Sequence, residues 1–569
     1  MRTNHRIFSY PWLFAALVAS YNFLIFLNQD CAAWSDDPAL NTPICTAFCN
    51  QFYPKIIGDG SGGAIIAWQD YRGPEDGPDI YAQRIDSSGV SLWTPDGVDI
   101  SPGYHYQYFP TLTGDGASGA IITWYDGSGT YMDIYAQGIN GSGNIQWTAD
   151  GEAICTADYH QNNPVIASDG TGGAIIAWND KRSGDLDIYA QRVTASGAIQ
   201  WSTNGEAMCT SDFAQFNPKI INAGTGRAVL VWGDNSKGAY DNDIYAQRVD
   251  PNGFPQWTST GKAICTASDM QINPDIAGTT FGRSIITWED NRNGDYDIYA
   301  QVIDIGGTVL WTANGKPVCT AGRDQKNPHI LSVGSEVIIT WADCRSGTWD
   351  IYAQRVNASG TSQWSSNGEP LCTATGDQEM PIITSDGSGG AIIVWMDHRS
   401  STTDIYAQRV DGSGVIQWTG DGVAVSIAVG DQETHDIISD GAGGAIITWQ
   451  DNRGGHYDIY AQRIYRDGNL VHAFYVSSDG NCGTRTPCYD SIQAAISGAP
   501  NGSAILVRRG TYPESISLGS PKTLFVKGGY NSTYDQQTAN KTFIQGVGQT
   551  KVRAPSGSLS FEMLTIGVQ

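Results

Sequence analysis

The chain has 569 residues and a formal net charge of −25, and 40% of its residues are hydrophobic. Its 68 Gly and 18 Trp favour short strands and tight turns over long helices. The negative charge repels phosphate backbones, so nucleic acid is an unsuitable partner, whereas cations, basic partners or neutral glycans fit such a surface.

Residues 1–33 resemble an export signal or a signal anchor. Arg2 and Arg6 precede an apolar run from Ile7 to Leu27, and Cys31 to Ala33 supplies small residues for cleavage. We expect cleavage just before Trp34. The alternative is an uncleaved anchor, because an apolar run of roughly 20 residues can span a bilayer. Both alternatives predict a secreted or cell-surface protein that meets the membrane only through this segment.

Residues 34–472 contain eight copies of the pentapeptide Asp-Ile-Tyr-Ala-Gln. Successive copies lie 53 to 56 residues apart. A period this regular indicates one supersecondary unit that is repeated along the chain. The copies begin at Asp79, Asp133, Asp187, Asp243, Asp297, Asp350, Asp404 and Asp458.

The third unit shows the predicted secondary structure. Apolar or alternating runs at residues 163–166, 174–178, 187–193 and 198–201 are separated by glycine-rich turns, which predicts a four-stranded meander. One meander cannot bury both of its faces, whereas eight packed around an axis can. The sequence therefore predicts an all-β, eight-bladed β-propeller of four-stranded blades. An open β-solenoid is the main alternative.

The two ends of the repeat region predict that the ring closes. Seven units carry a Trp in the predicted fourth strand, and the eighth lacks it. The missing features stand at the start of the chain, as Trp34 and the segment Ile44 to Thr46. We expect the first and last segments to complete one blade together, and which of them supplies the outer strand stays open at this point.

Other recurring residues have structural explanations. The Trp of each Trp-x-Asp sequence is expected to pack between blades. A Gln before every first strand is expected to bond backbone groups, with ligand contact as the alternative. Cysteines at equivalent positions of successive units lie too far apart to pair. The expected disulfide joins Cys482 and Cys488, within a loop, with Cys45 and Cys49 as the alternative pair.

The loop between the second and third strands is the candidate metal site. Several carboxylates lie within eight residues and could bind Ca²⁺ through oxygen atoms. An Arg between them, such as Arg182 or Arg292, suggests instead a salt-bridged turn. The candidate ligands are Asp180, Asp185, Asp187, Asp290, Asp295 and Asp297.

The second unit departs most from the repeat. Its first strand is preceded by an aromatic patch that could stack on sugars, with packing between blades as the alternative; the patch consists of Tyr104, His105, Tyr106 and Tyr108. We predict no catalytic residues, because the chain contains no nucleophile-elbow, zinc-protease or phosphate-loop motif.

Two stretches resemble known families. The segment from Ile188 to Trp201 resembles the repeat of quinoprotein-like (PQQ-like) propellers, and the Asp169–Gly173 turn loosely resembles an Asp-box. Residues 473–569 resemble the opening of a pectin-lyase-like right-handed β-helix, with an expected capping helix at Ile492–Ile496 followed by apolar strands. The second resemblance implies an exported bacterial protein that binds or processes polysaccharide through an incomplete β-helix.

Three functions are compatible with these features. The first is a non-catalytic binding or adhesion scaffold for glycan or protein ligands, acting as a monomer. The alternative is a polysaccharide-active lyase or hydrolase that works through the β-helix or the propeller mouth. The third is a quinone-dependent dehydrogenase. We expect no certain cofactor apart from the candidate Ca²⁺.

Overall fold

The computed structural model describes residues 34–73, 77–102, 106–235, 237–238, 241–471, 473–482, 487–499, 503–513, 516–517, 524–530, 542–545, 559–562 and 564–567. The predicted export segment, residues 1–33, lies outside these ranges. Within them, no helix is long and apolar enough to cross a membrane.

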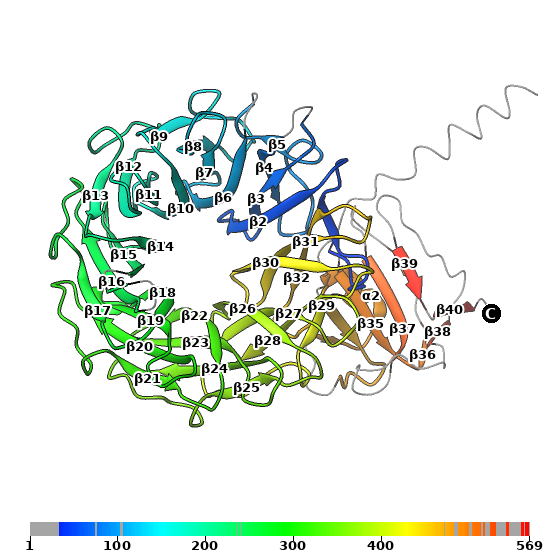
Figure 1. Ribbon diagram of the computed structural model, residues 1–569. Helices are drawn as coiled ribbons and strands as arrows, with labels where there is room; N and C mark the ends of the chain where they lie inside the picture. Colours follow the sequence, from blue (N-terminus) through cyan, green and yellow to red (C-terminus); the bar gives the residue numbers. More distant parts are fainter. Residues whose placement is uncertain are drawn as a thin grey trace, which may run out of the picture.

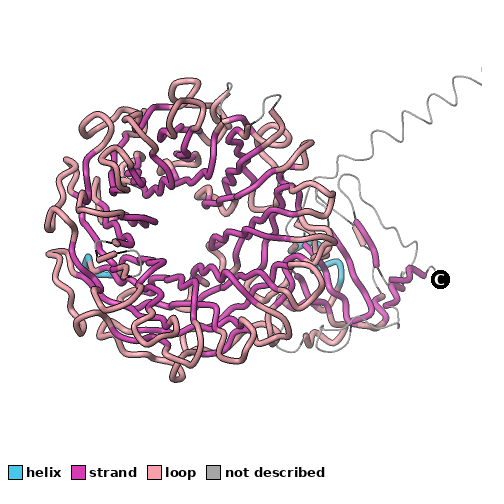
Figure 2. Tube along the Cα trace, in the orientation of Figure 1, coloured by secondary structure: helices cyan, strands magenta, loops and turns pink. Residues whose placement is uncertain are grey.

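Eight four-stranded antiparallel sheets surround a central axis, with the loops at the periphery (Figures 1 and 2). The predicted eight-bladed β-propeller is therefore confirmed. The first four blades are formed by β2 (Gln51–Gly58), β3 (Ala64–Asp70), β4 (Asp79–Ile85) and β5 (Val98–Asp99); β6 (Gln107–Gly114), β7 (Ala120–Asp126), β8 (Asp133–Ile139) and β9 (Glu152–Cys155); β10 (Gln161–Ser168), β11 (Ala174–Asp180), β12 (Asp187–Val193) and β13 (Glu206–Cys209); and β14 (Gln215–Asn222), β15 (Ala228–Asp234), β16 (Asp243–Val249) and β17 (Lys262–Cys265).

The remaining blades repeat this plan, and a single 3₁₀ turn, η1 (Thr280–Gly282), interrupts blade five. Blades five to eight are formed by β18 (Gln271–Gly278), β19 (Ser284–Asp290), β20 (Asp297–Ile303) and β21 (Lys316–Cys319); β22 (Gln325–Val333), β23 (Glu336–Asp343), β24 (Asp350–Val356) and β25 (Glu369–Cys372); β26 (Gln378–Ser385), β27 (Ala391–Asp397), β28 (Asp404–Val410) and β29 (Val423–Ser426); and β30 (Gln432–Ser439), β31 (Ala445–Asp451) and β32 (Asp458–Ile464) with β1 (Thr42–Cys45).

The N-terminal segment supplies the outer strand of blade eight. Strand β1 pairs antiparallel with β32, with Thr42 opposite Ala461. This resolves the question that the sequence left open about which end closes the ring. Because the first and last parts of the chain share one sheet, unfolding either end exposes the edge of that blade.

The predicted position of the fourth strand was wrong. In blade three this strand is β13, and the segment that contains Trp201 makes only an isolated bridge between Val193 and Ile199. The side chain of Gln191 accounts for the difference. Its Oε1 accepts from the amide of Trp201 at 2.9 Å and its Nε2 donates to the carbonyl of Ser202 at 2.8 Å, so a side chain takes the place of a continued backbone ladder.

The core lies between neighbouring blades. All seven residues of β11 are buried, and Trp178 packs with Ile121, Ile134 and Cys155 of blade two. Packing between blades, as predicted for the Trp-x-Asp tryptophans, is confirmed. Burial also raises the pKa of the Cys155 thiol to about 12, so this cysteine behaves as a small apolar residue.

The glutamines that precede the first strands form hydrogen bonds with the backbone. Gln161 is fully buried, and its Nε2 donates to the carbonyl of Tyr159 at 2.8 Å. Gln51 makes the same type of bond, to the carbonyl of Cys49 at 3.0 Å. The structural explanation of these glutamines is therefore confirmed.

The C-terminal part differs from the propeller in using parallel strands. A helix, α2 (Ile492–Gly498), is capped by Ser491 where the sequence predicts a capping helix. A disulfide joins Cys482 and Cys488. One parallel sheet contains β33 (Ala473–Val476), β34 (Cys488–Tyr489), β35 (Ser503–Arg508), β37 (Leu524–Tyr530) and β39 (Leu559–Glu562), and a second contains β36 (Thr511–Tyr512), β38 (Thr542–Gln545) and β40 (Leu564–Gly567). The right-handed β-helix itself remains a prediction.

Candidate active site

One face of the propeller gathers the irregular parts of every blade. In an antiparallel meander, the start of strand one, the end of strand two and the loop that leads to strand three lie at the same edge. We call this edge of the ring the entry face. It holds the Gln-x-x-Pro sequences and the carboxylate-rich loops. The positions next to these sequences differ from unit to unit, so the variable residues of the repeat meet on this face.

Each first strand bulges next to the axis. In blade three the pairing shifts between Asn162 and Val165, and Asn163 has a φ of 50°. Asparagine tolerates this left-handed conformation, whereas aromatic and β-branched residues adopt it at an energetic cost. The same position has a φ between 48° and 55° in all eight blades, at Tyr53, Phe109, Asn163, Asn217, Asn273, Asn327, Met380 and Thr434.

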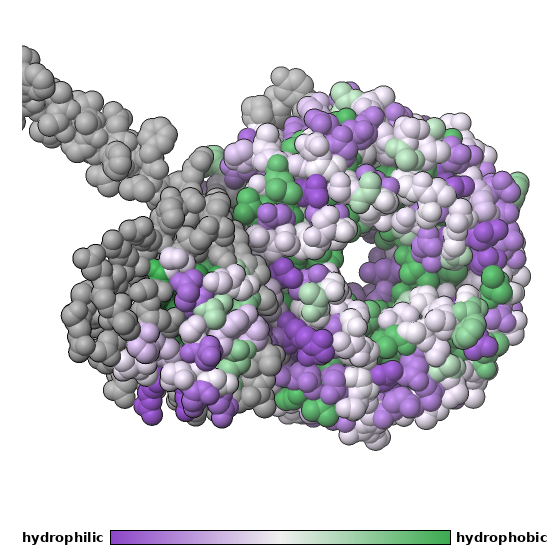
Figure 3. Space-filling model, turned by 180° about the vertical axis from the view of Figure 1, so that it is seen from behind, coloured by the Kyte–Doolittle hydropathy of each residue, from purple (hydrophilic) through white to green (hydrophobic). Residues whose placement is uncertain are grey.

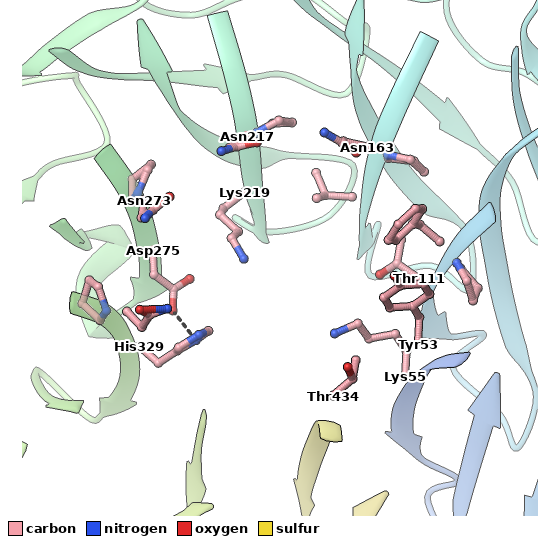
Figure 4. Close-up of a pocket in the computed structure, with 18 residues that line it drawn as sticks. Tyr53, Lys55, Thr111, Asn163, Asn217, Lys219, Asn273, Asp275, His329 and Thr434 are labelled. Atoms are coloured by element: carbon pink, nitrogen blue, oxygen red, sulfur yellow. Dashed lines mark ion pairs between the residues drawn. The ribbon is translucent and has the colours of Figure 1, made fainter. Parts of the chain in front are cut away.

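The bulges line an axial cavity of about 590 Å³. Lys55 and Lys219 point into it from opposite sides, and Asp275 and His329 meet beside Lys219 (Figure 4). Hydrophobic and hydrophilic residues both border the central opening in the view from behind (Figure 3). The charged residues occupy the same place in their units, directly after the proline of Gln-x-x-Pro.

Asp275 and His329 form the one ion pair drawn among the residues that line this cavity. Asp275 Oδ2 lies 3.3 Å from His329 Nδ1 and also accepts from the amide of Ile330 at 3.1 Å. Burial opposes ionisation of Asp275, but His329, Lys219 and the Ile330 amide outweigh it and lower the pKa of the carboxyl. The carboxylate therefore fixes the imidazole by its Nδ1 side and leaves Nε2 for a reacting group.

An aromatic groove of about 510 Å³ adjoins the axial cavity. Tyr53 and Phe109 line both spaces, with ring centroids 4.5 Å apart. Phe109 lies 5.8 Å from Tyr125, which stacks on Tyr108 at 5.4 Å. The outer part of the groove is lined by Tyr71, Tyr106, Tyr131 and His160. Faces and edges of aromatic rings along a groove suit the apolar faces of sugar rings.

Phe109 is held in its strained conformation by a neighbouring blade. Its amide donates to Oε1 of Gln69 at 3.3 Å, and its side chain is 42% exposed in the groove. Tyr53 is held in the same way, by Oε1 of Gln450 at 3.2 Å. Because this positive φ recurs in all eight blades, it belongs to the repeat itself, and what distinguishes this corner of the entry face is that aromatic residues occupy the position.

The aromatic patch predicted from the sequence lies partly in this groove. Tyr106 and Tyr108 line it, whereas Tyr104 and His105 lie outside the described residues. The Tyr108 ring stacks on Tyr125 of the same blade, within the core cluster between blades two and three, and it also borders the groove, so stacking on sugars stays a prediction.

The candidate calcium ligands are placed as a salt-bridged turn. Asp180 accepts from Nε of Arg182 at 2.9 Å and from Nε1 of Trp178 at 2.8 Å, and Asp187 accepts from Ser183 Oγ at 2.6 Å. Asp185 is exposed. Asp290, Asp295 and Asp297 hold the equivalent positions in blade five. Asp290 accepts from Nε of Arg292 at 2.7 Å, Asp297 from Nδ2 of Asn293 at 2.8 Å, and Asp295 from the amide of Arg323 at 3.1 Å. Across the described ranges, no three His, Cys, Asp or Glu side chains are grouped as a metal site.

Sequence reasoning missed the charged residues of the axial cavity. Lys55, Lys219, Asp275 and His329 lie in four different units, and none belongs to a motif. A signal was nevertheless present. The residue after the Gln-x-x-Pro proline changes chemical type from unit to unit, while its neighbours stay constant. Such variability within a repeat indicates a position whose residue type is not required for folding.

Comparison with known proteins gives structural matches only. No family model matches the chain, and no curated protein sequence matches it. Among solved structures, the polysaccharide lyase Uly1 has a TM-score of 0.39 and 10% identity, covering 68% of this chain and 93% of its own. A PL25 ulvan lyase has a TM-score of 0.38 and 11% identity, covering 62% and 91%. The α-L-arabinanase of Penicillium chrysogenum has a TM-score of 0.31 and 13% identity, covering 55% and 97%.

These matches correct one expectation from the sequence. The proteins named above are enzymes that act on glycans, which contradicts the hypothesis of a non-catalytic binding or adhesion scaffold. Their similarity to this chain is one of fold, so the chemistry of this protein is argued below from its own residues.

Proposed function

We propose that the protein is a lyase for acidic polysaccharides, with the polymer held in the aromatic groove and cleaved in the axial cavity. The observation that carries the proposal is the continuity of these two spaces through Tyr53 and Phe109, together with an Asp275–His329 pair that has Lys219 beside it and Lys55 across the cavity. Aromatic rings position the sugar, and charged groups act on it.

The residues match the needs of β-elimination. Lys55 and Lys219 would neutralise the carboxylate of a uronate, which makes the proton on the adjacent carbon more acidic. His329 Nε2 takes that proton, and the C–O bond to the leaving sugar breaks as a carbon–carbon double bond forms. The imidazolium returns the proton to the leaving oxygen, so atoms and charge balance. Asp275 stabilises the imidazolium and holds its orientation.

Hydrolysis fits the cavity less well. A glycosidase of the common type uses two carboxyl groups on opposite sides of the scissile bond, about 5–9.5 Å apart. Among the described residues that line the axial cavity, Asp275 supplies a carboxyl group; Asp436, at the equivalent position of blade eight, accepts from the amide of Ile56 at 3.2 Å. The cationic side chains also favour an anionic substrate over a neutral one.

Turnover of uronate-containing polysaccharides by the purified protein tests the proposal. Elimination produces an unsaturated sugar that absorbs ultraviolet light, whereas hydrolysis produces new reducing ends without that absorbance. We expect His329→Ala to lower the rate by about 10²–10⁴-fold, as for other general bases. His456→Ala, an exposed histidine outside both spaces, is the matched control and should keep full activity. Reducing ends without the ultraviolet signal, or full activity in His329→Ala, contradicts the lyase mechanism.

The rest of the chain suits this role. We infer that residues 1–33 direct export, that the partner is an extracellular polysaccharide, and that residues 473–569 belong to a right-handed β-helix. The parallel pairing of β33, β35, β37 and β39 supports the last inference. N-terminal sequencing of the exported protein tests cleavage before Trp34, and an experimental structure of the C-terminal part tests the winding of its chain.

A further inference from the structure

A second cluster of charge lies on the opposite face of the ring, which we call the exit face. In five blades an Arg from strand three forms an ion pair with a carboxylate near the turn between strands one and two. In blade three, Arg192 Nη2 lies 2.8 Å from Asp169 Oδ2. The other pairs are Arg84–Asp59, Arg355–Glu336, Arg409–Asp386 and Arg463–Asp440.

Blade four keeps the arginine but lacks the carboxylate. Ala223 stands where blade three has Asp169, and the turn is otherwise the same, because the amide of Ala223 bonds to the carbonyl of Arg227 at 3.0 Å as Asp169 does to Gly173. Within the described part of the chain, the Arg248 side chain makes no ion pair or hydrogen bond. In an acidic protein, a guanidinium without its usual carboxylate is an unmatched positive charge.

Blade five increases this local excess of positive charge. Thr279 replaces the carboxylate of its turn, Val302 replaces the strand-three arginine, and Arg283 stands where blade three has Gly173. Arg227 occupies the equivalent place in blade four and contributes to lowering the pKa of Arg248, after burial of the guanidinium itself. Relative to blade three, blades four and five together lack two carboxylates and one strand-three arginine and gain two arginines, Arg227 and Arg283, at one blade junction.

A cavity of about 270 Å³ opens at this junction. Arg248 and Arg283 line it together with Asn222, Ser284 and the ring of Trp257. The nearby carboxylates are already used in turns: Asp250 Oδ1 accepts from the amide of Asn252 at 2.9 Å, and Asp304 Oδ1 from that of Gly306 at 2.9 Å. The cavity therefore presents two guanidinium groups, amide and hydroxyl groups and one aromatic wall, together with Asp304, whose Oδ1 accepts from the amides of Gly306 and Thr308 at 2.9 and 2.8 Å.

We propose that this cavity binds an oxyanion, a carboxylate or sulfate group, carried by a ligand the size of one sugar. The oxyanion takes the place that Asp169 occupies against Arg192 in blade three, since a guanidinium binds both groups through two parallel hydrogen bonds. The apolar face of the attached sugar lies against Trp257. The site is on the opposite face from the axial cavity and is independent of the lyase proposal.

Calorimetric titration of the full-length protein with four probes tests the inference: glucuronate, glucose 6-sulfate, sodium sulfate and neutral glucose. We expect the charged sugars to bind. Equal affinity for sodium sulfate assigns the site to free oxyanions, and weaker sulfate binding assigns it to charged sugars. Binding of neutral glucose as strong as that of glucuronate, or no heat from any charged probe, overturns the proposal.

Two variants locate the site. Ala223→Asp restores the carboxylate of the other blades and should weaken binding by about tenfold or more while keeping or raising the melting temperature. Arg248→Met removes the guanidinium at similar volume and should weaken binding to the same extent. Unchanged affinity in both variants contradicts the proposal. Because Ala223→Asp repairs a pair used elsewhere in the protein, loss of binding in it does not arise from misfolding.

The same variants keep this inference separate from the lyase proposal. Neither Ala223 nor Arg248 lines the axial cavity or the aromatic groove. Turnover by Ala223→Asp should therefore equal that of the wild-type protein, whichever way the binding experiment ends.

Discussion

Trp34 Nε1 donates a hydrogen bond to the backbone carbonyl of Ser87 at 2.9 Å, and this contact joins blade eight to blade one. Trp34 is 2% exposed and packs against Gly89. The same contact recurs between other neighbouring blades, for example from Trp93 to Gly141 at 3.1 Å. The N-terminal tryptophan therefore completes the ring of inter-blade contacts as well as the sheet of blade eight.

Replacement of Trp34 by Ala should destabilise the protein by about 3–5 kcal/mol, because it removes a buried aromatic side chain and the bond that closes the ring. Denaturant unfolding followed by tryptophan fluorescence measures the change. Trp147→Ala is the matched control, since Trp147 makes the equivalent bond to Ala195 but is partly exposed. A loss for Trp34→Ala no larger than for Trp147→Ala contradicts the closing role.

Met380→Asn should stabilise the protein by about 1 kcal/mol. Met380 has a φ of 54° and is 49% exposed, and four other blades use Asn at this position. The substitution relieves left-handed strain with little loss of packing. Met380 does not line either space at the entry face, so turnover should stay unchanged, and unfolding in denaturant provides the measurement.

Phe109→Asn relieves the same strain but removes a ring from the groove. We expect little net change in stability, because the lost aromatic contacts, worth about 0.5–1.5 kcal/mol each, offset the relief. The KM for polysaccharide should rise. A variant that keeps its KM shows that the substrate does not stack on Phe109.

Asp180→Asn should destabilise the protein by about 3–5 kcal/mol. The Asp180 side chain is fully buried, and the change leaves the Arg182 guanidinium without its charged partner. Asp185→Asn, on the exposed part of the same loop, should change stability by less than about 0.5 kcal/mol. Thermal unfolding with and without calcium separates the two interpretations of the loop. A calcium-dependent rise in melting temperature that disappears in Asp185→Asn supports a metal site instead.

Asp133→Asn should stabilise the protein at pH 8 and have little effect at pH 4. Burial and the nearby Asp126 raise the pKa of Asp133 from 3.8 to about 6. Because the pKa is raised in the folded state, protonated Asp133 contributes to the free energy of unfolding. This contribution is complete below pH 3.8 and is lost as the pH rises through 6, so ionised Asp133 lowers stability at pH 8. We expect a gain of about 1 kcal/mol, because partial exposure screens the charge.

Chemical denaturation at the two pH values measures this effect. Asp187→Asn is the comparison. Burial raises the pKa of this carboxyl too, but Ser183 donates to it at 2.6 Å and the substitution disturbs that bond, so the gain at pH 8 should be smaller. An equal gain for Asp133→Asn at both pH values shows that the effect is not one of charge.

The repeat period determined the blade count, and the alternation of apolar runs and turns determined most strand positions. These features are local: Trp178 and the Asp187 pentapeptide are recognisable within one unit, because each unit must bury the same faces. The fourth strand was misplaced for a reason that is not local. The side chain of Gln191 accepts a hydrogen bond from the backbone amide of Trp201 and ends the predicted strand there. Only the folded structure reveals this contact.

Tertiary structure alone decided which variable residues meet. Lys55, Lys219, Asp275 and His329 are far apart in the chain and share one cavity because closure of the ring turns equivalent positions of different units towards a common axis. The same holds for Arg248 and Arg283 on the exit face. The sequence by itself established a repeated sheet whose units pack against one another, while export stays a prediction. Chemistry at the axis and at the blade junctions depends on long-range geometry that no single unit encodes.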